Sequence, residues 1–354
     1  MKRLGGVWQQ LVSFENLLLA FTKARRGKRR RNSVALFECN LEKELLQLQH
    51  ELISGTYCPG DYRQFTIYER KPRLISAAPF RDRVIHHAIM NVIEPTIDRR
   101  FINDSYACRK GKGTHAAVAR YQDYAHHYRY ALKMDIARYF PSIDHLLLKQ
   151  KLRRYLKDPR LLGLLDSIID SNPCASTPFV YFLGDDLLTH LERPVGIPIG
   201  NLTSQFFANV YLDDFDHYVK EELKVKAYLR YVDDMVLLSN DKDQLAEWRE
   251  SCRNRLASER LTLHPHKAHI SPVRLGVDLL GYRVFPDHRR LRNDNGHRFI
   301  RKLRHFAHAY AQGRLSWADI NPSVQSWIGH AQQADTLGLR KRLFSTIVFQ
   351  RGRT

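Results

Sequence analysis

Apolar and polar positions change their spacing several times along the first third of the chain. Residues 40–55 carry apolar side chains at helical spacing, with Asn40 as the expected N-cap and Gly55 as the stop. Residues 62–80 alternate in the manner of a β-hairpin, and residues 81–101 return to helical spacing. This part of the chain therefore predicts a helix, a hairpin and a second helix.

The rest of the chain predicts a further sheet flanked by helices. The expected elements are a strand at 129–136, a helix after Pro141, loop with some strand at 171–198, an amphipathic helix at 201–223, an apolar hairpin at 228–240, a helix at 242–260, a strand pair at 278–286 and three helical stretches from residue 296 onward. This order predicts an α+β fold and argues against a doubly wound α/β fold.

The apolar hairpin contains two adjacent carboxylates, in the sequence YVDDMVLL. Asp233 and Asp234 lie between apolar residues, where a carboxylate is costly unless a cation offsets its charge. A third aspartate, Asp135 in LKMDIARYF, ends another apolar strand. Each aspartate alone is readily explained as a turn or cap residue. Together, the three could meet on one sheet face and hold two Mg²⁺ ions, because hard oxygen ligands suit that metal. Two ions about 3.5–4 Å apart can activate an attacking hydroxyl and stabilise a leaving pyrophosphate.

Composition adds a polyanion as the expected partner. The chain has 354 residues, 44% of them hydrophobic, which is enough for two or three domains with real cores. Its net charge is +20, and the two ends carry most of it: residues 1–32 hold nine Lys or Arg against one Glu, and residues 283–354 hold fourteen against four Asp. Two basic ends around a nearly neutral centre predict that nucleic acid is gripped from both sides, although a basic surface can also serve solubility alone.

The sequence predicts a cytoplasmic protein with no membrane contact. No apolar run reaches the roughly 18–20 residues that a membrane span needs, and the N-terminal stretch lacks the features of a signal peptide. The five cysteines are widely spaced and form no CxxC motif, which suits a reducing compartment.

These motifs resemble the reverse transcriptases over roughly residues 60–345. The resemblance rests on YVDD in its apolar hairpin and on DIxxxF after a strand. It also rests on KPRLISAAPFRDRV, SYACRKGKGTHAAV, GIPIGNLTSQFFANVYLDDFD, LHPHKAHI and LLGYRVF. It implies a right-hand polymerase fold with fingers, a palm of antiparallel sheet and helices, and a small helical thumb. The corresponding division is a basic N-terminal arm at 1–32, fingers with the start of the palm at 33–128, the palm at 129–285 with a loop insertion at 171–195, and a helical basic thumb at 286–354.

The resemblance also implies roles for individual residues. Asp135, Asp233 and Asp234 match the catalytic carboxylates, and the Ile136 carbonyl matches a backbone ligand of the two Mg²⁺ ions, which Mn²⁺ can replace. Phe140 matches the steric gate that excludes a ribose 2′-OH, although ordinary core packing also explains it. The other residues expected to bind the incoming dNTP are Lys71, Arg73, Ile199, Gly200, Gln205 and Lys267. Lys28, Arg29, Arg30, Arg31, Arg301, Lys302 and Arg304 are expected to bind nucleic acid.

One motif points to a branch of the family. Most reverse transcriptases carry Gln where this chain has Ile199, and the pattern IGxxxSQ resembles the diversity-generating retroelement enzymes. Gln205 stands where Pro is usual. The resemblance implies copying of a template-repeat RNA into adenine-mutagenised cDNA for retrohoming, with an oligomeric, basic, helical accessory variability protein as partner. Two alternatives remain: a group II intron-like or defence-associated reverse transcriptase, and a catalytically inactive RNA-binding scaffold.

Overall fold

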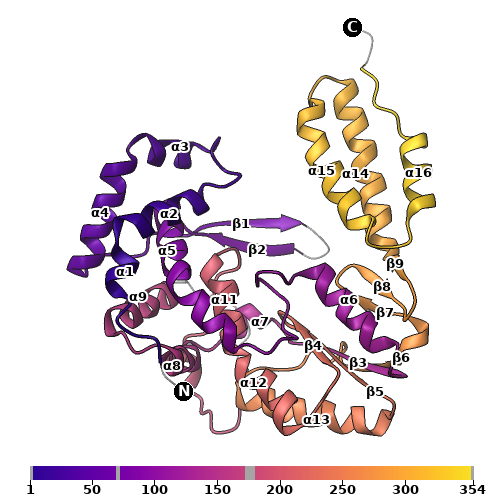
Figure 1. Ribbon diagram of the computed structural model, residues 1–354, viewed down its shortest axis with the longest axis horizontal. Coiled ribbons are helices and arrows are strands. Elements are labelled where there is room, and N and C mark those ends of the chain that lie inside the picture. The colour runs from indigo at the N-terminus through magenta and orange to yellow at the C-terminus, as the bar shows by residue number, and fades with distance from the viewer. Residues whose placement is uncertain (1–2, 69–71, 172–179, 352–354) are drawn as a thin grey trace.

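The computed structural model describes residues 3–68, 72–171 and 180–351 (Figure 1). An N-terminal lobe, a central sheet with its helices, and a C-terminal group of helices follow one another along the chain. The expected α+β class is confirmed, and every pairing of the named strands is antiparallel.

The N-terminal lobe is a set of helices packed around one long helix, with a two-stranded sheet beside it. Its elements are α1 (Trp8–Val12), α2 (Phe14–Ala24), α3 (Asn32–Cys39), α4 (Leu41–Ser54), β1 (Arg63–Tyr68), β2 (Pro72–Ala77), α5 (Phe80–Ile97) and the short η1 (Asp98–Arg100). The predicted hairpin and both predicted helices of this region are confirmed, and Gly55 ends α4 in a left-handed conformation, with φ of 73°. The Asn40 side chain donates to the Leu36 carbonyl instead of capping α4.

The segment expected as a basic arm, residues 1–32, contains two packed helices. Leu11, Leu17 and Phe21 are at most 1% exposed and belong to the same core as the inner face of α5. Ser13 caps α2 by accepting from the Asn16 amide at 3.2 Å. Helices α1 and α2 are therefore part of the folded lobe, and the basic run forms the turn between α2 and α3.

The central sheet has the strand order β4-β5-β3-β6. Its strands are β3 (Tyr130–Asp135), β4 (Tyr228–Tyr231), β5 (Asp234–Ser239) and β6 (His269–Pro272). Alternate residues of β3 enter different cores: Leu132 and Met134 join the core that contains Leu245 of α13, whereas Ala131 joins the core that contains Val118 of α6. The sheet is thus covered by α13 (Lys242–Ser258) on one face and by α6 (Thr114–Ala125) on the other.

Other helices surround the sheet, and one prediction here is wrong. The structure has α7 (Tyr139–Ser142), α8 (His145–Tyr155), α9 (Pro159–Asp170), α10 (Thr189–Glu192), α11 (Leu202–Tyr211), α12 (Asp213–His217), the short π-helix η2 (Tyr218–Glu222) and the 3-10 helix η3 (Val273–Leu275). The predicted single helix at 201–223 is broken at Leu212, and α11 is buried on nearly all sides. Its apolar residues face several neighbours at once, so the pattern was not that of an amphipathic helix.

The C-terminal part begins with a small sheet and ends in three helices. The sheet contains β7 (Val277–Leu279), β8 (Tyr282–Val284) and β9 (Arg289–Leu291), the last of which was not predicted; the helices are α14 (Asn293–Ala311), α15 (Trp317–Ala331) and α16 (Leu337–Thr346). Phe299 of α14 stacks on Trp327 of α15, with ring centroids 3.9 Å apart. No helix in the described ranges is long and apolar enough to cross a membrane.

Candidate active site

Three carboxylates gather at one end of the central sheet. A two-residue turn, Val232 and Asp233, joins β4 to β5, so that Asp234 begins β5. The antiparallel pairing of β3 with β5 places Asp135 opposite Asp234. Residues that are far apart in the sequence are therefore brought together by strand register.

Two of these carboxylates are paired with lysines. Lys267 forms an ion pair with Asp135, and Lys133 Nζ lies 3.2 Å from Asp234 Oδ1. Burial, followed by the negative charges of Asp135 and Asp234, raises the pKa of Asp233 to about 6. Asp233 therefore has an environment in which an added cation would favour its ionised form.

The donor atoms suit a hard cation, but they are not gathered around one. Within the described residues, no three Asp, Glu, His or Cys side chains stand as a ready metal-binding group. Asp135 and Asp234 are instead paired with Lys267 and Lys133. All three carboxylates are oxygen donors, as Mg²⁺ prefers, and a bound cation would replace the lysine charges and stabilise ionised Asp233. Ile136 forms an antiparallel bridge with Leu263. Of the two backbone hydrogen bonds on either side of this bridge, neither has the Ile136 carbonyl as its acceptor.

The loop at 196–200 forms hydrogen bonds both with the turn after β3 and with the N-terminal lobe. The Ile197 amide donates to the Phe140 carbonyl, and the Ser76 amide of β2 donates to the Ile199 carbonyl, both at 3.0 Å. Gly200 has φ of 123°, and a Cβ there would lie 3.0 Å from Ile75 Cγ2, so a larger residue would be strained. Phe140 itself is half-buried, with its ring 5.8 Å from that of Tyr139.

The remaining residues predicted to bind dNTP lie in different surroundings. Arg73 is exposed on β2, opposite Ile67. Gln205 is exposed on α11, where its side-chain oxygen lies 3.4 Å from Cys108 Sγ. Lys267, expected near a leaving phosphate, is the partner of Asp135. Lys71 lies outside the described residues.

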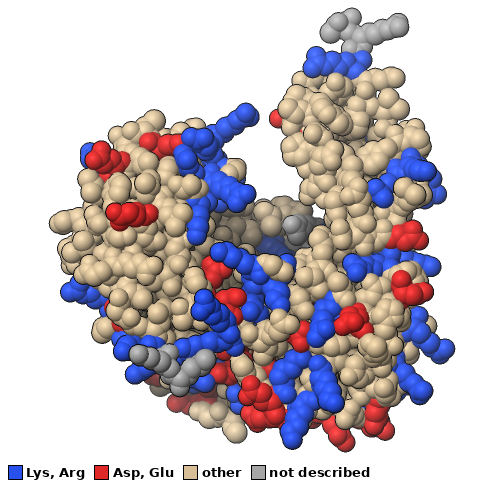
Figure 2. Space-filling model, in the orientation of Figure 1, with Lys and Arg blue, Asp and Glu red and all other residues tan. Residues whose placement is uncertain are grey.

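The predicted nucleic-acid-binding residues occupy two separate elements. Lys28, Arg29, Arg30 and Arg31 belong to the turn between α2 and α3, which Figure 2 shows as a group of basic side chains facing the hollow between the N-terminal lobe and the C-terminal helices. Arg29 is partly neutralised by Glu38, at 2.8 Å. Burial, with the nearby charges of Arg83 and Arg31, lowers the pKa of Lys28. Arg301, Lys302 and Arg304 are exposed on α14.

Sequence reasoning missed an arginine that supports the carboxylate turn. Arg230 of β4 is fully buried and forms a bidentate ion pair with Asp216, through Nε at 2.8 Å and Nη2 at 2.6 Å. Its Nη1 also donates to the Val232 carbonyl at 3.0 Å. The signal was present in YLRYVDD, because an arginine inside an apolar strand requires a buried acceptor.

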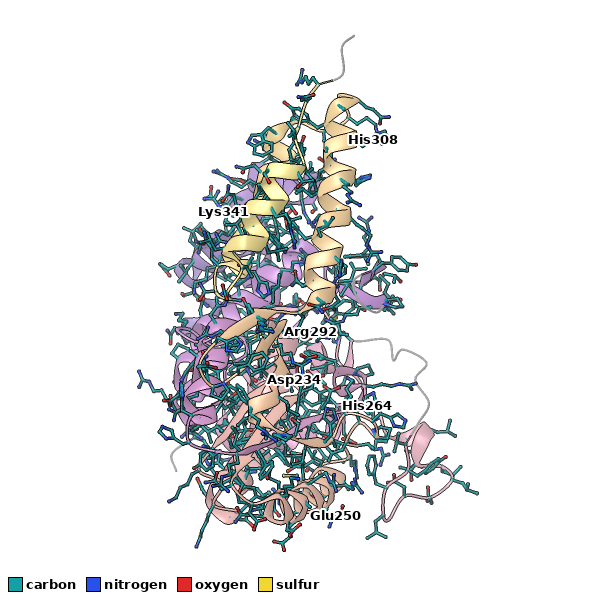
Figure 3. All side chains as sticks on the ribbon, turned by 90° about the vertical axis from the view of Figure 1, so that its right-hand side faces the viewer. Asp234, Glu250, His264, Arg292, His308 and Lys341 are labelled. Carbon is teal, nitrogen blue, oxygen red and sulfur yellow. The ribbon has the colours of Figure 1, made fainter. Side chains whose placement is uncertain are left out.

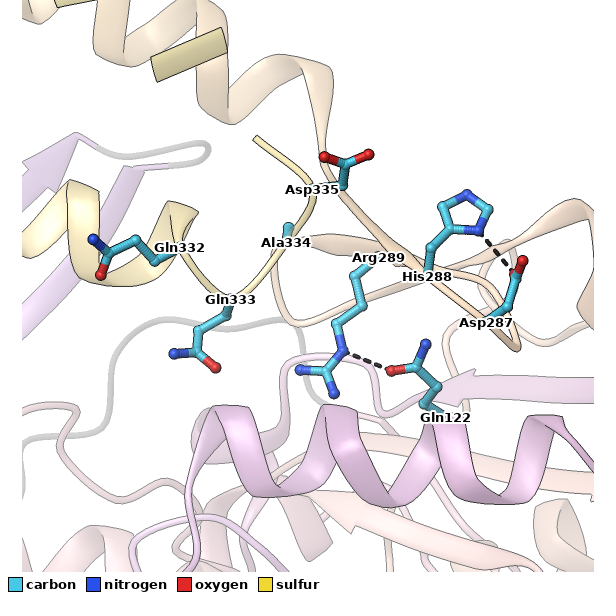
Figure 4. A pocket seen from close by; sticks show the side chains of 8 residues that line it. All are labelled: Gln122, Asp287, His288, Arg289, Gln332, Gln333, Ala334 and Asp335. Carbon is cyan, nitrogen blue, oxygen red and sulfur yellow. Dashed lines mark hydrogen bonds and ion pairs between the residues drawn. The ribbon is translucent and has the colours of Figure 1, made fainter. Parts of the chain in front are cut away.

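A separate polar pocket lies where the C-terminal helices meet the rest of the molecule (Figure 4). It has a volume of about 250 Å³ and is lined by Gln122, Asp287, His288, Arg289, Gln332, Gln333, Ala334 and Asp335. Arg289 Nε donates to the Gln122 side chain at 2.7 Å. None of its lining residues was predicted as a site residue.

In the side view, Asp234 lies within the central sheet, below the C-terminal helices that carry His308 and Lys341 (Figure 3).

Comparison with known proteins gives one family and several distant relatives. Residues 64–284 match the family described as reverse transcriptase (RNA-dependent DNA polymerase). Protein YkfC of Escherichia coli is 27% identical over 289 residues, which cover 70% of this chain and 73% of that protein. The group II intron-encoded protein LtrA of Lactococcus lactis is 24% identical over 188 residues, 52% of this chain and 29% of LtrA. The matched family segment includes all three carboxylates and the loop at 196–200.

Proposed function

The chain belongs to the reverse transcriptase family and is an RNA-directed DNA polymerase; from this premise we propose that Asp135, Asp233 and Asp234 carry its nucleotidyl transfer. The observation that supports this assignment is the register of β3 and β5, which sets Asp135 beside the turn that holds the other two. The raised pKa of Asp233, caused by burial and then by its two neighbours, is the electrostatic condition expected where a cation is to bind.

In this proposal Asp135, Asp233, Asp234 and the Ile136 carbonyl would hold two Mg²⁺ ions, or Mn²⁺ in their place. Those ions would favour the ionised primer 3′-hydroxyl and offset charge on the leaving pyrophosphate. The 3′-oxygen forms the new bond to the α-phosphorus of the dNTP, and the bond from that phosphorus to the pyrophosphate oxygen breaks. Lys267 would leave Asp135 and turn toward the phosphates, because the cation takes over its role as counter-charge.

The nucleotide would lie against the surface formed by the turn after β3 and the loop at 196–200, which are hydrogen-bonded to each other. Phe140 would exclude a 2′-hydroxyl by its bulk, Ile199 would pack against the nucleotide, and Gly200 would allow its close approach. Arg73 and Lys71 would hold the triphosphate, since a guanidinium matches phosphate geometry. Gln205, on α11, has its side-chain oxygen 3.4 Å from Cys108 Sγ, so it would have to turn away from Cys108 to reach the nucleotide.

The basic turn and α14 would hold the template and the growing duplex. Figure 2 shows the basic turn on the N-terminal side of the hollow, and α14 belongs to the helical group on the other side, whose face toward the hollow is mostly tan. This placement fits a duplex bound between the N-terminal lobe as fingers and the C-terminal helices as thumb. The chain thus takes template RNA, cDNA and dNTPs as partners.

The test of this assignment is Asp233→Asn in primer extension with Mg²⁺. The variant keeps the shape of the side chain but loses the charge, so we expect cDNA synthesis to fall below a few per cent while RNA affinity stays near that of the wild type. Synthesis well above that level would show that Asp233 does not carry the reaction.

For the biological role we propose a diversity-generating retroelement enzyme that copies a template-repeat RNA and works with a basic helical accessory protein. Ile199 and the IGxxxSQ pattern support this role. The match to LtrA supports the alternative, a group II intron-like enzyme. Sequencing cDNA made by the purified protein distinguishes them, because errors concentrated at template adenines belong to the first role and evenly distributed errors to the second.

A further inference from the structure

The turn that presents Asp233 has an unusual residue in its first position. Val232 has φ of 57°, and Tyr231 pairs with Asp234, so the loop between the strands is only two residues long. Such turns normally place Gly, Asn or Asp at positive φ, because a β-branched side chain is crowded there. The backbone at Val232 must therefore be held in place by its surroundings.

Arg230 supplies that hold, and it is itself fixed on every side. Its guanidinium is fully buried and bonds to both oxygens of Asp216, to the Asn209 side chain at 3.2 Å and to the Val232 carbonyl at 3.0 Å. Tyr228 donates to the same Asp216 at 2.6 Å. The backbone of Arg230 also bonds to the strand-like segment at 104–106, through the Asp104 carbonyl and the Tyr106 amide, both at 2.9 Å.

We propose that Arg230 is a positioning residue for the metal site: it fixes the Val232 carbonyl so that the next residue, Asp233, is presented toward Asp135. The inference rests on the proposed role of Asp233. Asp216 already neutralises the charge of Arg230, so Arg230 acts through geometry. A planar guanidinium can donate to Asp216 from two nitrogens and to the Val232 carbonyl from the third. A lysine ammonium has a single nitrogen and cannot replace this arrangement.

The purely structural alternative is that Arg230 only anchors β4 to α12. In that case its replacement changes stability, but any protein that remains folded binds metal normally. Metal affinity therefore separates the two roles, and it can be measured without template, primer or dNTP.

The experiment measures Mn²⁺ binding by electron paramagnetic resonance, together with the melting temperature, for the wild type, Arg230→Lys and Asp216→Asn. We expect Mn²⁺ affinity to fall about tenfold or more in Arg230→Lys and about threefold in Asp216→Asn, since residues that orient metal ligands typically contribute 10- to 100-fold. The matched control is Arg109→Lys, another arginine with a side chain only 8% exposed, whose hydrogen bonds go to Asp98, Ile102 and Ser105. It should bind Mn²⁺ as the wild type does.

Each outcome has one meaning. Wild-type affinity in a folded Arg230→Lys overturns the proposal, and so does an equal loss in Arg109→Lys. If Arg230→Lys does not fold, Asp216→Asn decides alone: lower affinity supports positioning, and unchanged affinity overturns it. Asp233→Asn is measured in parallel, and wild-type Mn²⁺ binding there would contradict the metal site itself, not the role of Arg230.

Val232→Gly tests the backbone part of the inference. Glycine adopts positive φ without crowding, so the turn should depend less on Arg230. The loss of Mn²⁺ affinity caused by Arg230→Lys should be smaller in the Val232→Gly background. The same loss in both backgrounds would show that Arg230 does not act through this turn.

Discussion

Asp135 and Asp234 face each other across β3 and β5, and each is held by its own lysine, Lys267 and Lys133. The third carboxylate, Asp233, lies beside both of them, in the turn that joins β4 to β5. Burial, and then the charges of Asp135 and Asp234, raise its pKa to about 6. The metal-free site therefore carries an electrostatic cost that appears only when Asp233 ionises.

The first prediction is a pH dependence of stability. In the unfolded chain an aspartate has a pKa of about 3.9, so between that value and about 6 the folded protein binds the proton more tightly. The contribution of Asp233 to the free energy of unfolding is most favourable below pH 4. It is lost as the pH rises through 6 and does not return at higher pH. Asp233→Asn should raise the free energy of unfolding by roughly 1–3 kcal/mol at pH 7 and by almost nothing at pH 4. Urea denaturation of both proteins without divalent metal measures this, and an equal difference at the two pH values would contradict it.

The second prediction concerns the choice of sugar. Phe140→Ala should allow ribonucleotides to be incorporated, because removal of the ring opens space for one hydroxyl. Phe140→Tyr is the matched control, since it keeps the ring and should keep the preference for dNTPs. Single-nucleotide extension with each substrate gives the ratio of kcat/KM values. An unchanged ratio in Phe140→Ala would mean that Phe140 only packs.

The third prediction concerns fidelity. The Ile199 carbonyl is fixed by the Ser76 amide, so a change of side chain should leave the loop in place. Ile199→Gln adds a group that can hydrogen-bond the nucleotide, worth roughly 0.5–1.5 kcal/mol, or about a three- to tenfold gain in discrimination. We expect misincorporation opposite template adenine to fall more than opposite other bases, as measured by deep sequencing of cDNA.

A control keeps that test specific. Ile199→Leu has similar volume and no hydrogen-bonding group, and its errors should resemble those of the wild type. Equal error at adenine in the wild type and in an active Ile199→Gln would place the preference elsewhere, for example at Arg73 or in an accessory protein.

The fourth prediction concerns the basic turn. Deleting residues 1–31 would remove the buried α1 and α2, so substitution is the cleaner change. Replacing Lys28, Arg30 and Arg31 by Ser should reduce the slope of log affinity against log salt by about 2, since each lost contact with single-stranded phosphate removes about 0.7. The control removes three charges from α13, at Lys242, Arg249 and Arg253. An RNA titration over several salt concentrations that gave equal slopes would show that the turn does not touch RNA.

The candidate site was predictable from the sequence where its signal was local. Continuous apolar residues around Asp233 and Asp234 indicate a buried hairpin, and Asp135 ends an apolar strand, so the positions of all three carboxylates at strand ends were predictable. The partners of these carboxylates were not predictable, because register and folding bring Lys267 and Lys133 to them. The local sequence YLRYVDD did mark Arg230, but the identity of its partner was not predictable, because Asp216 lies in another element.

The fold shows the same division. The predicted hairpins and the C-terminal helices follow short-range patterns, and they are confirmed. The break at Leu212 and the burial of α11 depend on packing from several sides, which periodicity does not record. In the first 32 residues, the dense basic run predicted an arm, whereas α2 packs its apolar face into the core.

The position of β3 in the sheet has a consequence for how the chain is made. β3 lies between β5 and β6, yet both partners are synthesised about a hundred or more residues later. Until then the apolar residues of β3, among them Leu132 and Met134, have neither edge paired, and unpaired apolar strands invite aggregation. A nascent chain shorter than about 272 residues cannot complete this sheet. We therefore expect ribosome-bound intermediates to need chaperone protection from the synthesis of β3 until about residue 272, and catalytic competence to arise late.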